Sequence, residues 1–195
     1  MLTQTQLERY ADVLIWGLQT ARVERYKKGD LIMIRYDKAA LPLAEVLYPR
    51  LLEKGYHVTQ RMSLTERMEH DYYRLADPAQ LVFKTPGDQE LFNALNGLIS
   101  LRAPENITHL KTIEPDKIGK AAVARKYLND ILDVREAQGL FGWTLCICPT
   151  EELANHAGMT IGEYTDQIVK ACFLNRKDPL LHWKDIYKQA QSIKK

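Results

Sequence analysis

The densest combination of carboxylates and imidazole lies between positions 66 and 71, where Glu66, Glu69, His70 and Asp71 fall in one segment. In a helix, Glu66 and His70 would share a face because they are four residues apart. Such a pair could begin a metal site, but a structural zinc site needs four ligands. No second histidine or cysteine lies at ligand spacing nearby. We favour a solvated helix face with a local ion pair, and a metal site is the alternative.

The cysteines, Cys146, Cys148 and Cys172, all have apolar neighbours. Cys146 and Cys148 are two residues apart, so in a strand both thiols lie on one side. Two thiols cannot complete a zinc shell, and three cysteines are too few, and odd in number, for a disulfide framework. We interpret them as buried packing residues in a reducing compartment, with sensitivity to oxidation as the alternative.

The remaining histidines are scattered along the chain. His156 would act as a general base only beside a nucleophile and an orienting acid, and its neighbours in the sequence supply neither. We interpret it as a surface or helix-end residue, and we expect His57, His109 and His182 to be isolated structural polar residues. The sequence therefore assigns no catalytic, cofactor-binding or metal-ligating residue.

A modest basic cluster surrounds Tyr26 and consists of Arg22, Arg25, Lys27 and Lys28. A nucleic-acid surface would carry more basic residues and several stacking aromatic side chains. The net charge of +2 is also too small to indicate nucleic acid or an anionic membrane as a partner. We interpret the cluster as a solvated helix end. The glycine-rich fingerprints of dinucleotide sites and phosphate-binding loops are absent.

Composition bounds the class of protein. The chain has 195 residues, of which 46% are hydrophobic and 27% charged, as in ordinary globular proteins. A single large domain over residues 1–195 is the default at this length. Charged residues interrupt the first apolar stretch, so no signal peptide is expected, and no apolar run reaches the length of a membrane span. We expect a cytoplasmic protein with neither membrane nor nucleic acid as a partner.

The elements that must position these residues alternate between helix and strand. Helices are expected at 3–22, 41–54, 63–75, 91–95, 117–138, 160–173 and from 178 onward. Strands are expected at 31–34, 56–61, 81–83, 97–101 and 143–148. This alternation predicts an α/β fold with a mainly parallel sheet flanked by helices. The apolar runs at 31–34 and 143–148 suggest strands that are buried on both faces.

Individual residues mark the ends of several elements. Ser63 with Glu66, and Thr160 with Glu163, have the spacing of capping boxes. Pro49 falls inside an expected helix and should kink it. Apolar residues keep helical spacing from Leu180 almost to the end, although Lys194-Lys195 could favour a helix end. Because no glycine or proline stop follows, we expect that the chain once continued.

Several short motifs occur in a recognisable order along the chain. They are Leu7–Ala11, Lys28-Gly29-Asp30, Gly55, Trp143–Thr150, Ala154, Ala157–Thr160, Glu163-Tyr164, Asp178-Pro179 and Trp183. This order resembles the thermophilic metallo-aminopeptidase family, which includes aminopeptidase T, AmpS and PepS. The likeness covers nearly the whole chain, is weakest over 60–105, and departs from the family at Pro49.

The resemblance implies the non-catalytic N-terminal domain of a two-domain enzyme. Members release N-terminal residues from peptides with a divalent metal pair, typically zinc or cobalt, held by a C-terminal domain that would begin just past residue 195. The implied partners are that catalytic domain, a peptide substrate and a homo-oligomer. The fragment would scaffold the enzyme, wall the peptide cleft, bind no metal and be inactive alone. The alternatives are a stand-alone non-catalytic α/β binding or interaction module and, by fold analogy alone, a flavodoxin-like nucleotide binder.

Overall fold

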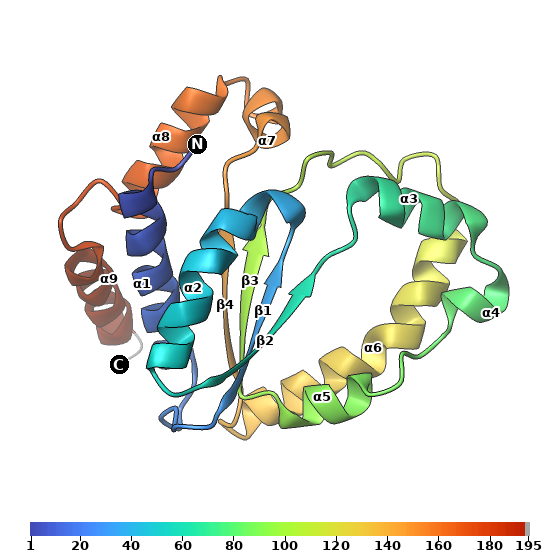
Figure 1. Ribbon diagram of the computed structural model, residues 1–195, viewed down its shortest axis with the longest axis horizontal. Coiled ribbons are helices and arrows are strands. Elements are labelled where there is room, and N and C mark those ends of the chain that lie inside the picture. The colour runs from blue at the N-terminus through green and yellow to red at the C-terminus, as the bar shows by residue number, and fades with distance from the viewer. Residues whose placement is uncertain (194–195) are drawn as a thin grey trace.

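A computed structural model describes residues 1–193, so Lys194 and Lys195 lie outside the described residues. Its centre is a four-stranded parallel sheet in the order β2-β1-β3-β4 (Figure 1). The strands are β1 (Leu31–Tyr36), β2 (His57–Met62), β3 (Gly97–Arg102) and β4 (Gly142–Ile147). The predicted α/β class with a parallel sheet is therefore confirmed.

Helices precede, connect and follow these strands. Their bounds are α1 (Gln4–Ala21), the 3-10 turn η1 (Lys38–Ala40), α2 (Leu41–Glu53), α3 (Glu66–Leu75), α4 (Pro78–Leu81), α5 (Asp88–Ala94), α6 (Pro115–Ala137), α7 (Glu151–His156), α8 (Ile161–Ala171) and α9 (Pro179–Ile193). As expected, Pro49 lies inside α2, which continues past it to Glu53.

The order of the strands creates a topological switch at β1. The chain leaves β1 for β2 on one side, and then returns across to β3 on the other side. Because all four strands are parallel, their carboxyl ends meet at one edge of the sheet. The register pairs Arg35 with Arg61 of β2 and with Ser100 of β3, so these residues lie on the same face of the sheet.

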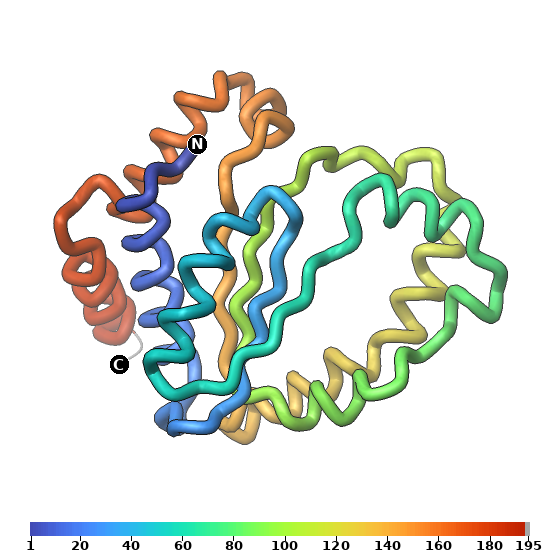
Figure 2. Tube along the Cα trace, in the orientation of Figure 1, coloured from blue at the N-terminus to red at the C-terminus, as the bar shows by residue number. Residues whose placement is uncertain are grey.

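Helices cover the two faces of the sheet unequally. On one face, α1 and α2 pack over the main core, which includes Ile34, Ile99 and Leu101. On the other face, α5 and α6 cover only the end of the sheet near the start of the strands, around Met33 and Leu98. Figures 1 and 2 show α3, α4 and the start of α6 standing away from the strands as a separate lobe.

The strand β4 differs from its prediction. Trp143, Leu145 and Ile147 are 49%, 50% and 44% exposed, whereas Cys146 on the opposite face is 5% exposed. The expected burial on both faces is therefore wrong for this strand. In the described residues α1 packs on one face of β4, and no helix covers the other as closely. The exposed side chains of Trp143, Leu145 and Ile147 are called the open β4 face below.

Two other local predictions are wrong. The segment 81–83 is not a strand: Asp77 forms a capping box with Gln80 that starts α4, and Leu81 ends that short helix. Ser63 does not cap α3, because the Thr65 hydroxyl accepts the hydrogen bond from the N–H of Met68 instead. The capping box of Thr160 and Glu163 at the start of α8 is confirmed. The helix α7 was not predicted.

Candidate functional site

A cleft of about 640 Å³ opens at the carboxyl ends of β1 and β3. Its floor and rim come from the residues after these strands, from the start of α3, from the loop after β3 and from α6. The charged residues that line it are Arg35, Asp37, Lys38, Glu66, Glu69, Arg102, Arg125 and, when protonated, His109. In open α/β sheets, ligands bind outside the carboxyl ends of the strands where the strand order switches. This cleft occupies that position.

The three carboxylates of the cleft are already engaged within the protein. Asp37 lies 3.4 Å from an Arg102 guanidinium nitrogen and accepts a 2.8 Å hydrogen bond from the N–H of Ala103. Glu66 accepts a 2.7 Å hydrogen bond from the N–H of Glu105. These bonds fix the loop after β3 against β1 and α3, so the carboxylates shape the wall of the cleft.

Glu69 has a partner that the sequence did not reveal. Its Oε2 lies 2.7 Å from Nε2 of His109, and Nδ1 of His109 lies 2.8 Å from the carbonyl oxygen of Asn106. Both ring nitrogens face acceptors, and the doubly protonated imidazolium satisfies both. The expectation that His109 is isolated is therefore wrong. The two residues are 40 positions apart, and only the tertiary fold brings them together.

The candidate group at 66–71 is split by the structure. Glu66 points to the backbone of Glu105, whereas His70 lies 3.5 Å from the Thr112 hydroxyl and 3.9 Å from Asp71. Asp71 is also paired with Arg74 at 3.0 Å. A metal site built from Glu66 and His70 finds no support in this arrangement, and the local ion pair that we favoured is present.

Electrostatic shifts agree with this geometry. Burial by itself raises the pKa of Glu66, but hydrogen bonds from the backbone of Glu105, Glu66 and Asn106 outweigh it, so the pKa of Glu66 is lowered. At Arg35, burial and then the positive charge of Arg102 lower the pKa, and the carboxylate of Asp37 offsets part of this shift. Arg35 thus carries a charge that its surroundings disfavour.

Glu66 and Glu69, two of the residues singled out from the sequence, line the cleft. Its arginines, Lys38 and Asp37 were missed because the sequence has no motif for them. Arg35 and Asp37 belong to the end of an apolar strand, and Arg102 ends another. The available indication was position: polar residues that end parallel strands meet at one edge of the sheet.

The three cysteines gather beside Tyr10, as packing residues should. Cys146 and Cys148 are each 5% exposed, and Cys172 is half-buried with its sulfur 3.7 Å from the Tyr10 hydroxyl. A hydrogen bond with Cys148, followed by burial, raises the pKa of the Cys146 thiol, and burial raises the pKa of Cys172. High thiol pKa values disfavour the reactive thiolate. The packing interpretation is confirmed.

The remaining histidines lie away from the cleft. His57 begins β2, at the opposite end of the sheet. His156 ends α7 and is exposed, as expected. His182 stacks on Phe173 with ring centroids 4.7 Å apart.

Arg22 is not part of a solvated helix end. Its side chain is 3% exposed, forms a 2.9 Å salt bridge with Asp30, and donates hydrogen bonds to the carbonyl oxygens of Glu24, Arg25 and Leu140. Its guanidinium also lies 3.9 Å from the centroid of the Tyr26 ring. The prediction is wrong for this member of the basic cluster, because its charge holds together the turn that leads into β1.

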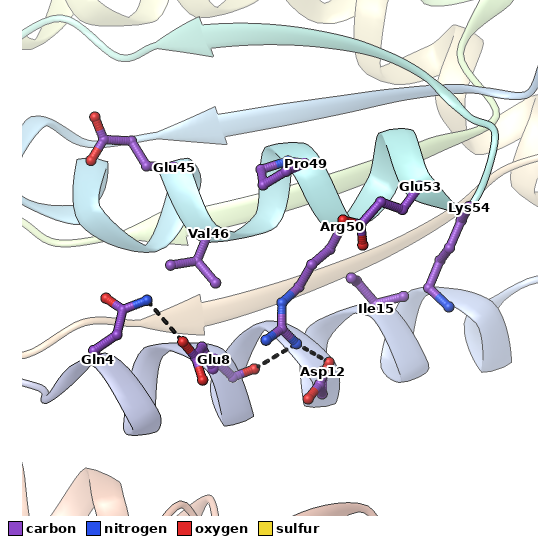
Figure 3. Close-up of a pocket in the computed structure, with 10 residues that line it drawn as sticks. All are labelled: Gln4, Glu8, Asp12, Ile15, Glu45, Val46, Pro49, Arg50, Glu53 and Lys54. Atoms are coloured by element: carbon purple, nitrogen blue, oxygen red, sulfur yellow. Dashed lines mark hydrogen bonds and ion pairs between the residues drawn. The ribbon is translucent and has the colours of Figure 1, made fainter.

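A second hollow, of about 720 Å³, lies between α1 and α2 (Figure 3). Arg50 reaches from α2 across this groove, where it pairs with Asp12 and donates to the carbonyl oxygen of Glu8. The groove is open and its central cation is satisfied by α1. We interpret it as the seam between two packed helices.

No helix among residues 1–193 has the length and apolar character needed to cross a membrane. Among the same residues, no three histidine, cysteine, aspartate or glutamate side chains converge as metal ligands would.

Comparison with protein families matches residues 3–195 to a family described as thermophilic metalloprotease (M29). Among solved structures, the chain is similar to wild-type AmpT from Thermus thermophilus, with a TM-score of 0.61 and 16% sequence identity. That similarity covers 85% of this chain and 42% of the AmpT chain, so this chain spans less than half the length of the structure it matches. At this identity the structure supports the fold alone. A search of curated proteins gives no match.

Proposed function

Because the chain belongs to the thermophilic metalloprotease (M29) family, we propose that it is the N-terminal part of a metal-dependent aminopeptidase. The observation that carries the proposal is the family match over residues 3–195, nearly the whole chain. The enzyme would remove N-terminal residues from peptides. This part would scaffold the enzyme and wall one side of the peptide cleft, without supplying the catalytic groups.

The division of labour is supported by what the described residues offer. A two-metal hydrolase needs a dense set of carboxylates and imidazoles to hold both ions and to generate a hydroxide nucleophile. Residues 1–193 bring no three such side chains together, so they do not fit a metal pair. We propose that the ligands for zinc or cobalt come from a second, C-terminal domain.

The open β4 face supports a packing partner. Trp143, Leu145 and Ile147 place a continuous apolar strip on a strand at the edge of the sheet. Large exposed apolar patches mark interaction surfaces more often than chance. We propose that the catalytic domain packs against this strip. Assembly into a homo-oligomer is a further part of the proposal.

The test compares the 195-residue chain with the product of the whole gene. Each is incubated with short peptides and zinc or cobalt, and the released N-terminal amino acid is measured. We expect chelator-sensitive release from the longer protein and none from the 195-residue chain. Chelator-sensitive release by the 195-residue chain would contradict the proposal. An inactive longer protein would favour the alternative of a binding or interaction module.

A further inference from the structure

We propose that the cleft at the carboxyl ends of β1 and β3 binds the oxyanion group of a small ligand, a phosphate or a carboxylate, through Arg35 and Lys38. The proposal does not depend on peptidase activity, because binding is measured without turnover.

The first observation is the balance of charge in the cleft. Arg35, Lys38, Arg102 and Arg125 face three carboxylates, those of Asp37, Glu66 and Glu69. Asp37 is held by Arg102 and by a backbone N–H. Glu66 is held by a backbone N–H, and Glu69 is held by His109. The four cations outnumber the three carboxylates by one, so the cleft carries a net positive charge.

The second observation is the position of Arg35. The register of β1 and β2 pairs Arg35 with Arg61, so two like charges are adjacent on one face of the sheet. Arg61 is relieved by a 2.9 Å salt bridge with Asp88. Within residues 1–193, Arg35 has no carboxylate within salt-bridge distance, and neither does Lys38. A bound oxyanion would offset the repulsion that this register imposes on Arg35.

The third observation is the location and size of the cleft. It lies at the topological switch point, where α/β sheets place their ligands, and its volume of about 640 Å³ suits a small molecule. Arg125 is exposed, donates a 2.8 Å hydrogen bond to the Tyr72 hydroxyl, and adds a further cation to the lining of the cleft. A guanidinium binds phosphate or carboxylate oxygens with two parallel hydrogen bonds.

The experiment titrates the 195-residue chain with three probes: inorganic phosphate, the dipeptide alanyl-alanine, and the same dipeptide with an amidated C-terminus. Affinity is measured by calorimetry, and the site is located by amide chemical-shift changes near residues 35–38 and 102–106. Binding of phosphate alone identifies a phosphate-bearing ligand. Binding of the free dipeptide but not its amide identifies a peptide carboxylate. Either result supports the oxyanion site.

The variants are Arg35→Gln and a matched control, Arg25→Gln, which removes the same charge from an exposed residue before β1. We expect Arg35→Gln to weaken binding about tenfold, as loss of a charge-assisted hydrogen bond should, and Arg25→Gln to change it less than about twofold. If circular dichroism shows that Arg35→Gln does not fold, Lys38→Gln replaces it with the same expectation. Equal weakening by Arg25→Gln, or no saturable binding of any probe, would overturn the proposal.

Discussion

At the scale of single residues, hydrogen-bond partners decide which polar side chain has a structural role. Ser63 and Thr65 are two positions apart and both precede a glutamate-rich helix start, so both suit an N-cap. Only the Thr65 hydroxyl accepts from the first turn of α3. The backbone N–H of Ser63 instead donates to the carbonyl oxygen of Tyr36, which extends the hydrogen bonding between β2 and β1 by one residue. That bond places the helix two residues later than its sequence motif suggests.

The cap at Thr65 gives a prediction with a built-in control. Replacing Thr65 with alanine removes the hydroxyl acceptor and should lower the free energy of unfolding by about 1 kcal/mol. Replacing Ser63 with alanine should change it by less than about 0.5 kcal/mol, because its hydroxyl caps nothing. Urea unfolding of the two variants measures the difference. A larger loss at Ser63 than at Thr65 would contradict the assignment of the cap.

Glu66 should make stability depend on pH. Its pKa is lower in the folded chain than in the unfolded chain, so its contribution to stability is complete above the ordinary glutamate pKa, near 4.3. The contribution is then lost as the pH falls through the lowered value in the folded state. The difference in unfolding free energy between the wild type and Glu66→Gln should therefore be constant above about pH 5.5 and shrink in more acidic solution.

The control for this pH dependence is Glu90→Gln, at an exposed residue of α5 with no hydrogen bond or salt bridge from its side chain within residues 1–193. Unfolding curves at a series of pH values measure both variants. If the difference in unfolding free energy between the wild type and Glu66→Gln did not change with pH, the assignment of a lowered pKa to Glu66 would be wrong.

At the scale of helices and strands, two segments with similar apolar sequences form strands that are covered to different extents. The runs at 31–34 and 143–148 are both continuously apolar, and both form strands as predicted. The first is central and its core residues are covered on both faces, whereas β4 is at an edge and covered well on one face only. Hydrophobic pattern predicts where a strand forms, but which faces are covered depends on where the crossing helices come to lie.

The same limit applies to the cleft. The alternation of helix and strand was enough to predict the parallel sheet and most of its helices. The pairs that build the cleft, Glu69 with His109 and Asp37 with Arg102, join residues that are distant in the sequence. Such pairs depend on the order of the strands, which local patterns do not specify. The segment 81–83 failed for a local reason, because the cap at Asp77 favours a helical turn over so short a strand.

The unequal cover of the sheet gives a prediction at this scale. Replacing Ile99, which is fully buried in β3, with alanine should cost about 3 kcal/mol of unfolding free energy through lost burial and a cavity. Replacing Leu145 on the open β4 face, which is 50% exposed, should cost less than about 1 kcal/mol in the 195-residue chain. Chemical denaturation of both variants tests this order. Equal losses would show that Leu145 is covered after all.

At the scale of the whole molecule, the chain has an open apolar face and spans 42% of the length of its structural neighbour. Helices α1 and α2 cover one face of the sheet and α5 and α6 cover part of the other, whereas three apolar side chains of β4 remain 44% to 50% exposed. If the catalytic domain packs there, the strip should change from exposed to buried in the longer protein.

Under the proposed function, a charge placed on this strip should affect the 195-residue chain and the longer protein differently. Leu145→Asp should change the melting temperature of the 195-residue chain little, because the side chain stays near water. In the longer protein, the same change would bury an unpaired carboxylate and should lower both the melting temperature and the peptidase activity markedly. Val123→Asp, at a residue of α6 that is 74% exposed, is the matched control and should affect neither form. A longer protein that tolerates Leu145→Asp would place the domain contact elsewhere.

The thiols around Tyr10 have a practical consequence for how opening of the molecule can be observed. Cys146 and Cys148 are each 5% exposed in the core that α1 covers, so a labelling reagent should reach them when this part of the core opens. Their alkylation rate, followed by mass spectrometry against half-buried Cys172, would time that opening without any introduced probe. The native cysteines of the chain can therefore report local unfolding of its core.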